Sequence, residues 1–205
     1  MITPLFIFAI FMLTLGPIKT VPAFFSLTQD QAPAAVRAFA LKGTAVATAV
    51  SLLIALVATA VAASWRVSAD DLRIAGGILL FAASREMIGQ FNRPAPPQPA
   101  GPHGSPAVTP LAVPIIVTPW GVTAILFFTD LAYGDAKMLA NVIGILLLVM
   151  LLNLAGMLFA KQIIARFGMI TFQVLGWIFA VLQAGLAVDA VVTSLRNLAL
   201  FQPMS

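Results

Sequence analysis

Long stretches without charged side chains dominate this chain. Residues 43–65, 138–160 and 167–188 form uncharged windows of 23, 23 and 22 residues. An α-helix rises about 1.5 Å per residue, so each window is long enough to cross the roughly 30 Å hydrocarbon core of a bilayer. The N-terminal stretch 3–28, interrupted by one lysine, and residues 107–129 have the same character. The pattern predicts helices that span a membrane.

A sixth stretch, 71–91, is less uniform, because Arg85 and Glu86 lie within its last two turns. A long arginine side chain can reach the membrane surface from such a position. The sequence therefore predicts an all-α membrane protein with six transmembrane helices, over residues 3–27, 40–63, 72–91, 108–129, 139–160 and 169–194.

The composition narrows the function classes. Of 205 residues, 61% are hydrophobic and only 18 are charged, 11 basic and 7 acidic, whereas soluble domains carry roughly 25% charged residues. A soluble enzyme, a disordered chain and a disulfide-stabilised secreted domain are therefore excluded, and the lipid bilayer is the expected partner. The basic residues are scattered singly, which argues against nucleic-acid binding. With no cysteine and one histidine, we expect no metal site and no cofactor.

The segment 92–107 divides the chain into two halves of three predicted spans each. Seven of the 14 prolines fall between Pro94 and Pro110, which indicates a stiff tether. We therefore expect a first three-helix membrane repeat over 1–91 and a second over 108–205. Because each half has an odd number of spans, homologous halves must have inverted orientations in the membrane.

The first predicted span of each half is interrupted by proline near its middle. Residues 14–22 read TLGPIKTVP and residues 114–121 read PIIVTPWG, and Pro17 and Pro119 lie 102 positions apart. Proline frees backbone carbonyls, which cost several kcal/mol each in lipid unless protein or water satisfies them. Two interpretations remain, kinks packed against neighbouring helices or a solute site between half-helix ends, and paired breaks in inverted halves favour the second. The candidate substrate-binding residues are Thr14, Gly16, Pro17, Lys19, Thr118, Pro119 and Gly121.

Lys19 lies deep in the first span, two residues after Pro17. An ammonium near the middle of a bilayer costs about 2.5–3.5 kcal/mol on insertion scales, so it needs a compensating partner. It could pair with an acid such as Asp189, bind carbonyls freed by Pro17 and Pro22, or face a wet cavity. We expect Lys19 to line a site for an anionic or amino-acid-like small solute, beside a helix N-terminus that also favours negative charge. The alternative is a lysine that reaches the membrane surface and has no role.

Asp189 lies about two turns before the end of the last predicted span. Inside the membrane it is a candidate for ion or proton coupling, whereas an earlier helix end would place it at the interface. Both interpretations stay open. Four amides are expected to hydrogen-bond between helices: Asn141, Asn153, Gln173 and Gln183.

Catalysis is not expected, because the deep polar groups include no histidine, cysteine or glutamate. The favoured function is a small-solute transporter or exporter with a site between the two broken helices. A membrane scaffold or regulatory protein that transports nothing is the alternative, and an intramembrane enzyme comes last. The sequence leaves open the solute, the coupling ion and whether the chain forms a homo-oligomer.

The distribution of lysine and arginine predicts the orientation in the membrane. The loops after the first, third and fifth spans hold six basic residues and the opposite side holds four, and no basic residue precedes the first span. Residues 1–4 also lack the basic start of a cleaved signal. Because basic residues favour the cytoplasmic side, we expect both termini in the periplasm and segment 92–107 in the cytoplasm.

Several motifs resemble those of the MarC family of bacterial integral membrane proteins, which is grouped with the LysE-type exporter superfamily. They are residues 16–24, 72–81 (LRIAGGILLF), 110–119 (PLAVP leading to Pro119), and 166–168 with Gly176 and Asp189. The resemblance covers essentially the whole chain and implies six helices, a location in the bacterial inner membrane and, loosely, transport. The chain departs from the family pattern at two places. Gly16-Pro17 with Lys19 stands where Asn-Pro followed by Gly is usual, and Thr118-Pro119-Trp120 stands where Gly-Pro-Gly is usual.

Overall fold

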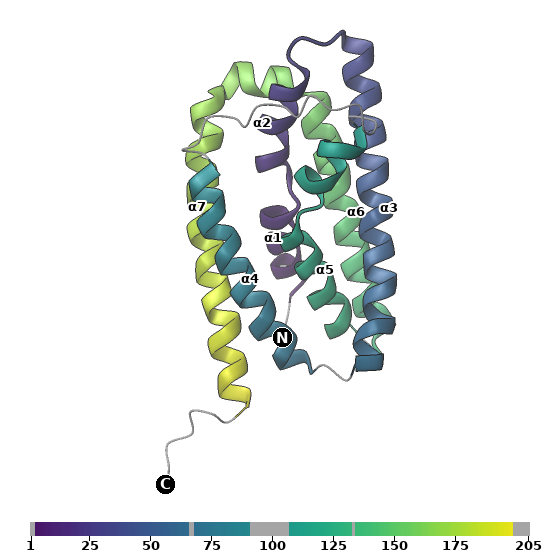
Figure 1. Ribbon diagram of the computed structural model, residues 1–205, viewed down its shortest axis with the longest axis vertical. Coiled ribbons are helices and arrows are strands. Elements are labelled where there is room, and N and C mark those ends of the chain that lie inside the picture. The colour runs from purple at the N-terminus through teal and green to yellow at the C-terminus, as the bar shows by residue number, and fades with distance from the viewer. Residues whose placement is uncertain (1–2, 66–67, 91–106, 133, 199–205) are drawn as a thin grey trace.

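The computed structural model describes residues 3–65, 68–90, 107–132 and 134–198, and within these ranges every regular element is a helix (Figure 1). The tether predicted over 92–107 lies outside the described residues apart from Ala107, where a helix begins. In chain order the helices are α1 (Pro4–Thr14), α2 (Pro17–Thr28), α3 (Pro33–Trp65), α4 (Ala69–Gln90), η1 (Ala107–Ile116), α5 (Pro119–Leu131), α6 (Ala136–Leu158) and α7 (Ala160–Asn197).

Four helical stretches among the described residues are long and apolar enough to cross a membrane. They are Pro4–Thr28, Pro33–Val57, Ala136–Leu158 and Ala160–Asn197. α4 is not among them: it carries acidic residues in its first turn and Arg85 and Glu86 towards its end. α5 is apolar but short, because the break before it interrupts the predicted span. The chain is therefore a helical membrane protein, and its six-span arrangement stays a prediction.

The first predicted break is confirmed, because the stretch 3–27 forms two helices rather than one. Pro17 occupies the first turn of α2, where its missing N–H costs nothing, and Gly16 has an extended backbone (φ −77°, ψ 174°). A β-carbon on Gly16 would overlap the carbonyl oxygen of Met12. Only glycine therefore allows the chain to turn this closely between α1 and α2.

The second predicted break is also confirmed. η1 is a π-helix, and at its end the N–H of Val117 donates to the carbonyl of Ala112 (2.9 Å). Pro119 then opens α5, and the Thr118 side chain caps that helix by accepting from the N–H of Gly121 (3.1 Å). Each half of the chain thus has a broken helix whose second piece starts at a proline.

Two predicted helix boundaries are wrong at their N-terminal ends. α3 begins at Pro33 rather than near residue 40, because proline suits a first helical turn and the alanine-rich segment after it favours helix. α7 begins at Ala160 rather than near residue 169, although the backbone of Gly168 (φ 75°, ψ 157°) interrupts it. Charged residues such as Arg37 and Lys161 marked these ends as loops in the sequence, but both are exposed on helical surface.

The helices pack so that each broken helix lies against a long helix of the other half. α6 contacts α1 and α2, and α3 contacts η1 and α5. α4 and α7 form a close pair along one side of the bundle (Figure 1). A β-carbon on Gly77 would lie 2.7 Å from the carbonyl oxygen of Ala187, so the small residue lets the two backbones approach.

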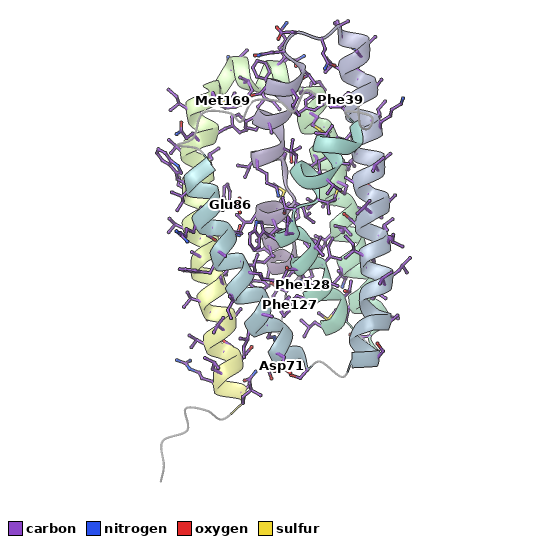
Figure 2. The ribbon with its side chains drawn as sticks, viewed as in Figure 1. Phe39, Asp71, Glu86, Phe127, Phe128 and Met169 are labelled. Carbon is purple, nitrogen blue, oxygen red and sulfur yellow. The ribbon has the colours of Figure 1, made fainter. Side chains whose placement is uncertain are left out.

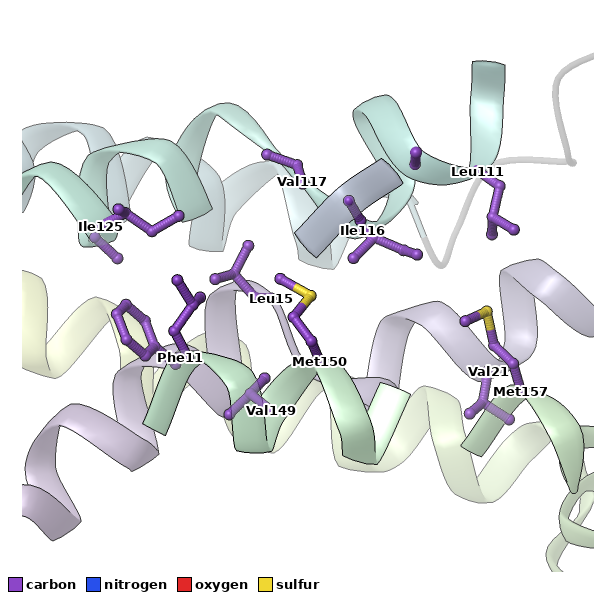
Figure 3. Close-up of a cluster of buried hydrophobic side chains, with 14 of the residues drawn as sticks. Phe11, Leu15, Val21, Leu111, Ile116, Val117, Ile125, Val149, Met150 and Met157 are labelled. Carbon is purple, nitrogen blue, oxygen red and sulfur yellow. The ribbon is translucent and has the colours of Figure 1, made fainter. Parts of the chain in front are cut away.

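The core surrounds the two breaks. Phe11 and Leu15 from the first broken helix face Ile116 and Ile125 from the second, and Met150 of α6 closes the cluster (Figure 3). The outer faces of α3, α6 and α7 are also apolar, as expected for surfaces that contact lipid. Five of their large apolar side chains are each at least 60% exposed: Leu53, Leu56, Leu151, Ile170 and Val181.

Candidate functional site at the crossing of the two broken helices

The two breaks touch each other in the interior of the bundle. The hydroxyl of Thr118 donates to the carbonyl oxygen of Thr14, 104 residues earlier in the chain (3.1 Å). One turn further along α5, a β-carbon on Gly121 would overlap the side chain of Leu15. The two breaks are therefore not separate kinks, because they pack directly against each other.

Lys19, in the first turns of α2, joins this crossing. Its ammonium donates to the carbonyl oxygen of Thr14 and to the hydroxyl of Thr118 (3.2 Å). The Thr118 hydroxyl, which also accepts from the N–H of Gly121, thus uses its hydrogen and both lone pairs. Of the three environments expected for Lys19, the carbonyl at the break is observed and a cavity lies beside it, whereas Asp189 lines a different cavity.

Two further carbonyls at the first break accept hydrogen bonds from side chains. Asn153 in the middle of α6 donates its amide to the carbonyl oxygen of Leu15 (2.6 Å), and the Thr20 hydroxyl donates to that of Gly16 (3.2 Å). These bonds meet the requirement that backbone oxygens inside a membrane find protein or water partners. The predicted cross-helix role of Asn153 is confirmed, and its partner proves to be the break itself.

A cavity of about 240 Å³ opens beside the crossing, with Lys19 in its wall. α4 contributes Glu86 to this cavity, α5 contributes Trp120 and α7 contributes Gln183. Figure 2 shows Glu86 on α4 next to the space between that helix and the broken helices. The wall thus holds one ammonium, one carboxylate and several hydrogen-bonding groups, a set that can bind a small polar solute at two points.

The predicted site residues divide into three groups. Thr14, Lys19 and Thr118 line the cavity. Four others form the backbone of the breaks and are not among the residues of the cavity wall: Gly16, Pro17, Pro119 and Gly121. Asp189 lies elsewhere, at a second cavity of about 420 Å³ between α1, α4, α5 and α7.

Sequence reasoning missed Glu86 and Trp120 as cavity residues. Glu86 lies inside a predicted span, which is a signal for function that could have been followed. Gln183 was predicted to bond between helices, and its amide does donate to the carbonyl oxygen of Leu80 on α4 (3.2 Å). Its place in the cavity wall depends on the α4–α7 packing, which no local pattern reveals.

Comparison with known proteins identifies the family. The sequence model for MarC family integral membrane proteins matches residues 3–199, nearly the whole chain. The chain belongs to the MarC family. This MarC-family protein is also similar to the UPF0056 membrane protein MJ1677 of Methanocaldococcus jannaschii, with 27% identity over 198 residues, which cover 89% of this chain and 91% of that protein. No solved structure matches it.

Proposed function

We propose that this protein carries a small solute across the bacterial inner membrane, through a site at the crossing of its two broken helices. The solute has an anionic group and is of amino-acid-like size. The observation that carries the proposal is the position of the Lys19 ammonium, which lies at the contact between both breaks and in the wall of a 240 Å³ cavity. The proposal involves no chemical change of the solute.

The charge of Lys19 supports an anionic solute. Both of its acceptors at the crossing, the Thr14 carbonyl and the Thr118 hydroxyl, are neutral oxygens that leave the positive charge uncancelled. Glu86 in the same cavity wall suits an ammonium group on the other end of the solute. A zwitterion such as an amino acid would place an opposite charge next to each of these two groups.

The packing supports an inverted repeat. α6 contacts the first broken helix and α3 contacts the second, while α2 contacts α7 and α5 contacts α4. Exchange of the two halves preserves each of these contacts, as a two-fold relation between repeats requires. In transporters built this way, discontinuous helices from both repeats form the solute site near the middle of the membrane.

The paths of the helices support six crossings with both termini on one side. α1 begins, and α7 ends, towards the lower end of the bundle in Figure 1, while α3 and α5 run in the direction opposite to α6. An even number of crossings gives this result. We place the termini in the periplasm and segment 92–107 in the cytoplasm on the distribution of basic residues. A coupling role for Asp189 stays a prediction.

The proposal is tested by flux into proteoliposomes that contain the purified protein. A panel of amino acids and small carboxylates is offered to the native protein, to Lys19→Met and to Lys42→Met. Lys42 is the matched control, because it is exposed on α3 away from the cavity. We expect flux of at least one anionic or zwitterionic solute for the native protein and for Lys42→Met, and flux at the background of empty liposomes for Lys19→Met.

Thermal stability separates loss of the site from loss of the fold. Lys19→Met should unfold near the native temperature, because removal of a partly buried ammonium also removes its desolvation cost. Full flux in Lys19→Met would remove Lys19 from the site. No flux by the native protein with any solute of the panel would favour a scaffold that transports nothing.

A further inference from the structure

We propose that the second cavity, between α1, α4, α5 and α7, binds a hydrophobic organic cation, with Asp189 as its counter-ion. The ligand is an ammonium with an aromatic or branched alkyl group. This site goes beyond the proposed function, because it lies apart from Lys19 and takes the opposite charge. It also differs from a coupling site for a proton or metal ion, because its walls fit an organic group.

The size and walls of the cavity suit such a ligand. Its volume of about 420 Å³ falls in the range of pockets that enclose small organic molecules. Phe6, Phe127 and Phe128 form an aromatic wall, in which the Phe6 and Phe128 rings lie 6.2 Å apart at 80° and the Phe127 and Phe128 rings 5.0 Å apart at 62°. Figure 2 shows Phe127 and Phe128 beside the lower part of α4. Aromatic faces attract cations and have no such attraction for anions.

Asp189 supplies the negative charge. The residue is exposed and lines the cavity, and its carboxylate has no hydrogen bond or ion pair within the part of the chain that the structure describes. Arg73 is the cation of the cavity wall, but its guanidinium is paired with Asp70 (3.4 Å) and lies over the Phe127 ring (5.9 Å). Asp70 is in turn held by the amide of Asn197 (3.1 Å).

The remaining charged groups at this end of the bundle do not neutralise Asp189. Asp71 bonds to the Ser68 hydroxyl at the start of α4 (2.6 Å). Arg196 follows Asp189 by about two turns of α7 and is exposed. Asp70, Asp71 and Asp189 thus stand against Arg73 and Arg196, three negative charges against two positive ones, and of the five only Asp189 and Arg73 line the cavity. An anion would therefore meet repulsion there, and a neutral molecule would gain nothing from the carboxylate.

A hydrogen bond separates this cavity from the one at Lys19. The Gln183 amide donates to the carbonyl oxygen of Leu80 (3.2 Å); Gln183 lines the smaller cavity and Leu80 lines the larger. The two sites therefore have separate tests, because a change at Lys19 leaves the walls of the Asp189 cavity intact.

The test is equilibrium dialysis of radiolabelled benzyltrimethylammonium against the protein in nanodiscs of phosphatidylcholine, with empty nanodiscs as the blank. Phenylacetate and benzyl alcohol, which have the same ring with a negative charge and with no charge, are measured in parallel. We expect saturable binding of one cation per chain and no saturable binding of the other two compounds.

Four variants, two in the cavity wall and two controls, assign the binding to the cavity. Asp189→Asn should weaken the affinity about tenfold, because it removes the counter-ion, and Phe6→Leu should weaken it about threefold, because it removes an aromatic ring from the cavity wall. Asp30→Asn, which removes an exposed carboxylate between α2 and α3, is the matched control and should bind as the native protein does. Lys19→Met should also bind normally, even if the proposed transport site fails.

Three results would overturn the proposal. The first is the absence of saturable cation binding to the native protein. The second is equal binding by the native protein and Asp189→Asn. The third is saturable binding of phenylacetate or benzyl alcohol as tight as that of the cation, which would show that the cavity recognises the ring and not the charge.

Discussion

Gly121 lies directly on Leu15, so closely that any side chain on Gly121 would occupy the space of the leucine. Leu15 is fully buried between the two broken helices, next to the Thr14 carbonyl that Thr118 and Lys19 share. At this contact the broken helices of the two halves pack against each other. It makes the glycine a requirement of the crossing rather than of the turn.

Gly121→Ala is expected to destabilise the protein by about 1–3 kcal/mol, because the added methyl group overpacks a closed contact. The measurement is thermal unfolding of the purified protein in detergent, followed by circular dichroism. Gly144→Ala is the control: a β-carbon there meets nothing within 4 Å, and alanine favours helix, so its unfolding temperature should stay the same or rise. Equal stability of the two variants would contradict the close contact.

Asn153→Leu is expected to cost about 1–3 kcal/mol, because it leaves the Leu15 carbonyl without its side-chain donor in an apolar interior. Thermal unfolding again provides the measurement. Asn141→Leu changes the same residue type at an exposed position of α6 and should leave stability nearly unchanged. If both variants unfold at the temperature of the native protein, water or another group must donate to the Leu15 carbonyl.

Thr118→Val should separate the effect of the Thr118 hydroxyl from the effect of the shape of this side chain. Valine keeps the volume but cannot cap α5, bond to the Thr14 carbonyl or accept from Lys19, so we expect a loss of about 1–2 kcal/mol and reduced flux. Thr118→Ser retains the hydroxyl and should recover most of both properties. Flux and unfolding temperature are measured on the same preparations. A serine variant as impaired as the valine variant would assign the effect to the lost methyl group.

The topology is tested by reporter fusions. A phosphatase reporter, active only in the periplasm, should be active when fused after residue 198, and a fluorescent reporter that folds only in the cytoplasm should be active when inserted within 92–107. The reason is the excess of basic residues on the side of that segment. A cytoplasmic C-terminus would contradict either the six-span count or the orientation.

The sequence by itself determined the class of protein and the positions of its breaks. In a bilayer, a long uncharged segment must satisfy its backbone hydrogen bonds internally, and an α-helix does this within one segment. The helical membrane architecture therefore follows from composition and length. Pro17 and Pro119 interrupt their helices because proline has no backbone N–H, and the sequence alone shows where the prolines lie. The depth of Lys19 in the membrane can also be predicted from the sequence, because it follows from counting residues along a span.

Only the tertiary structure decided which groups meet. Thr14 and Thr118 are 104 residues apart, and Asn153 and Leu15 are 138 apart, so their bonds depend on how whole helices cross. Asp189 and Lys19, which the sequence offered as a pair, line different cavities because α7 presents Asp189 towards the end of the bundle and Gln183 towards its middle. Hydrophobic periodicity predicts which face of a helix is buried, but it does not predict which other helix packs against that face. The partners are set by packing, where small residues such as Gly121 let backbones approach.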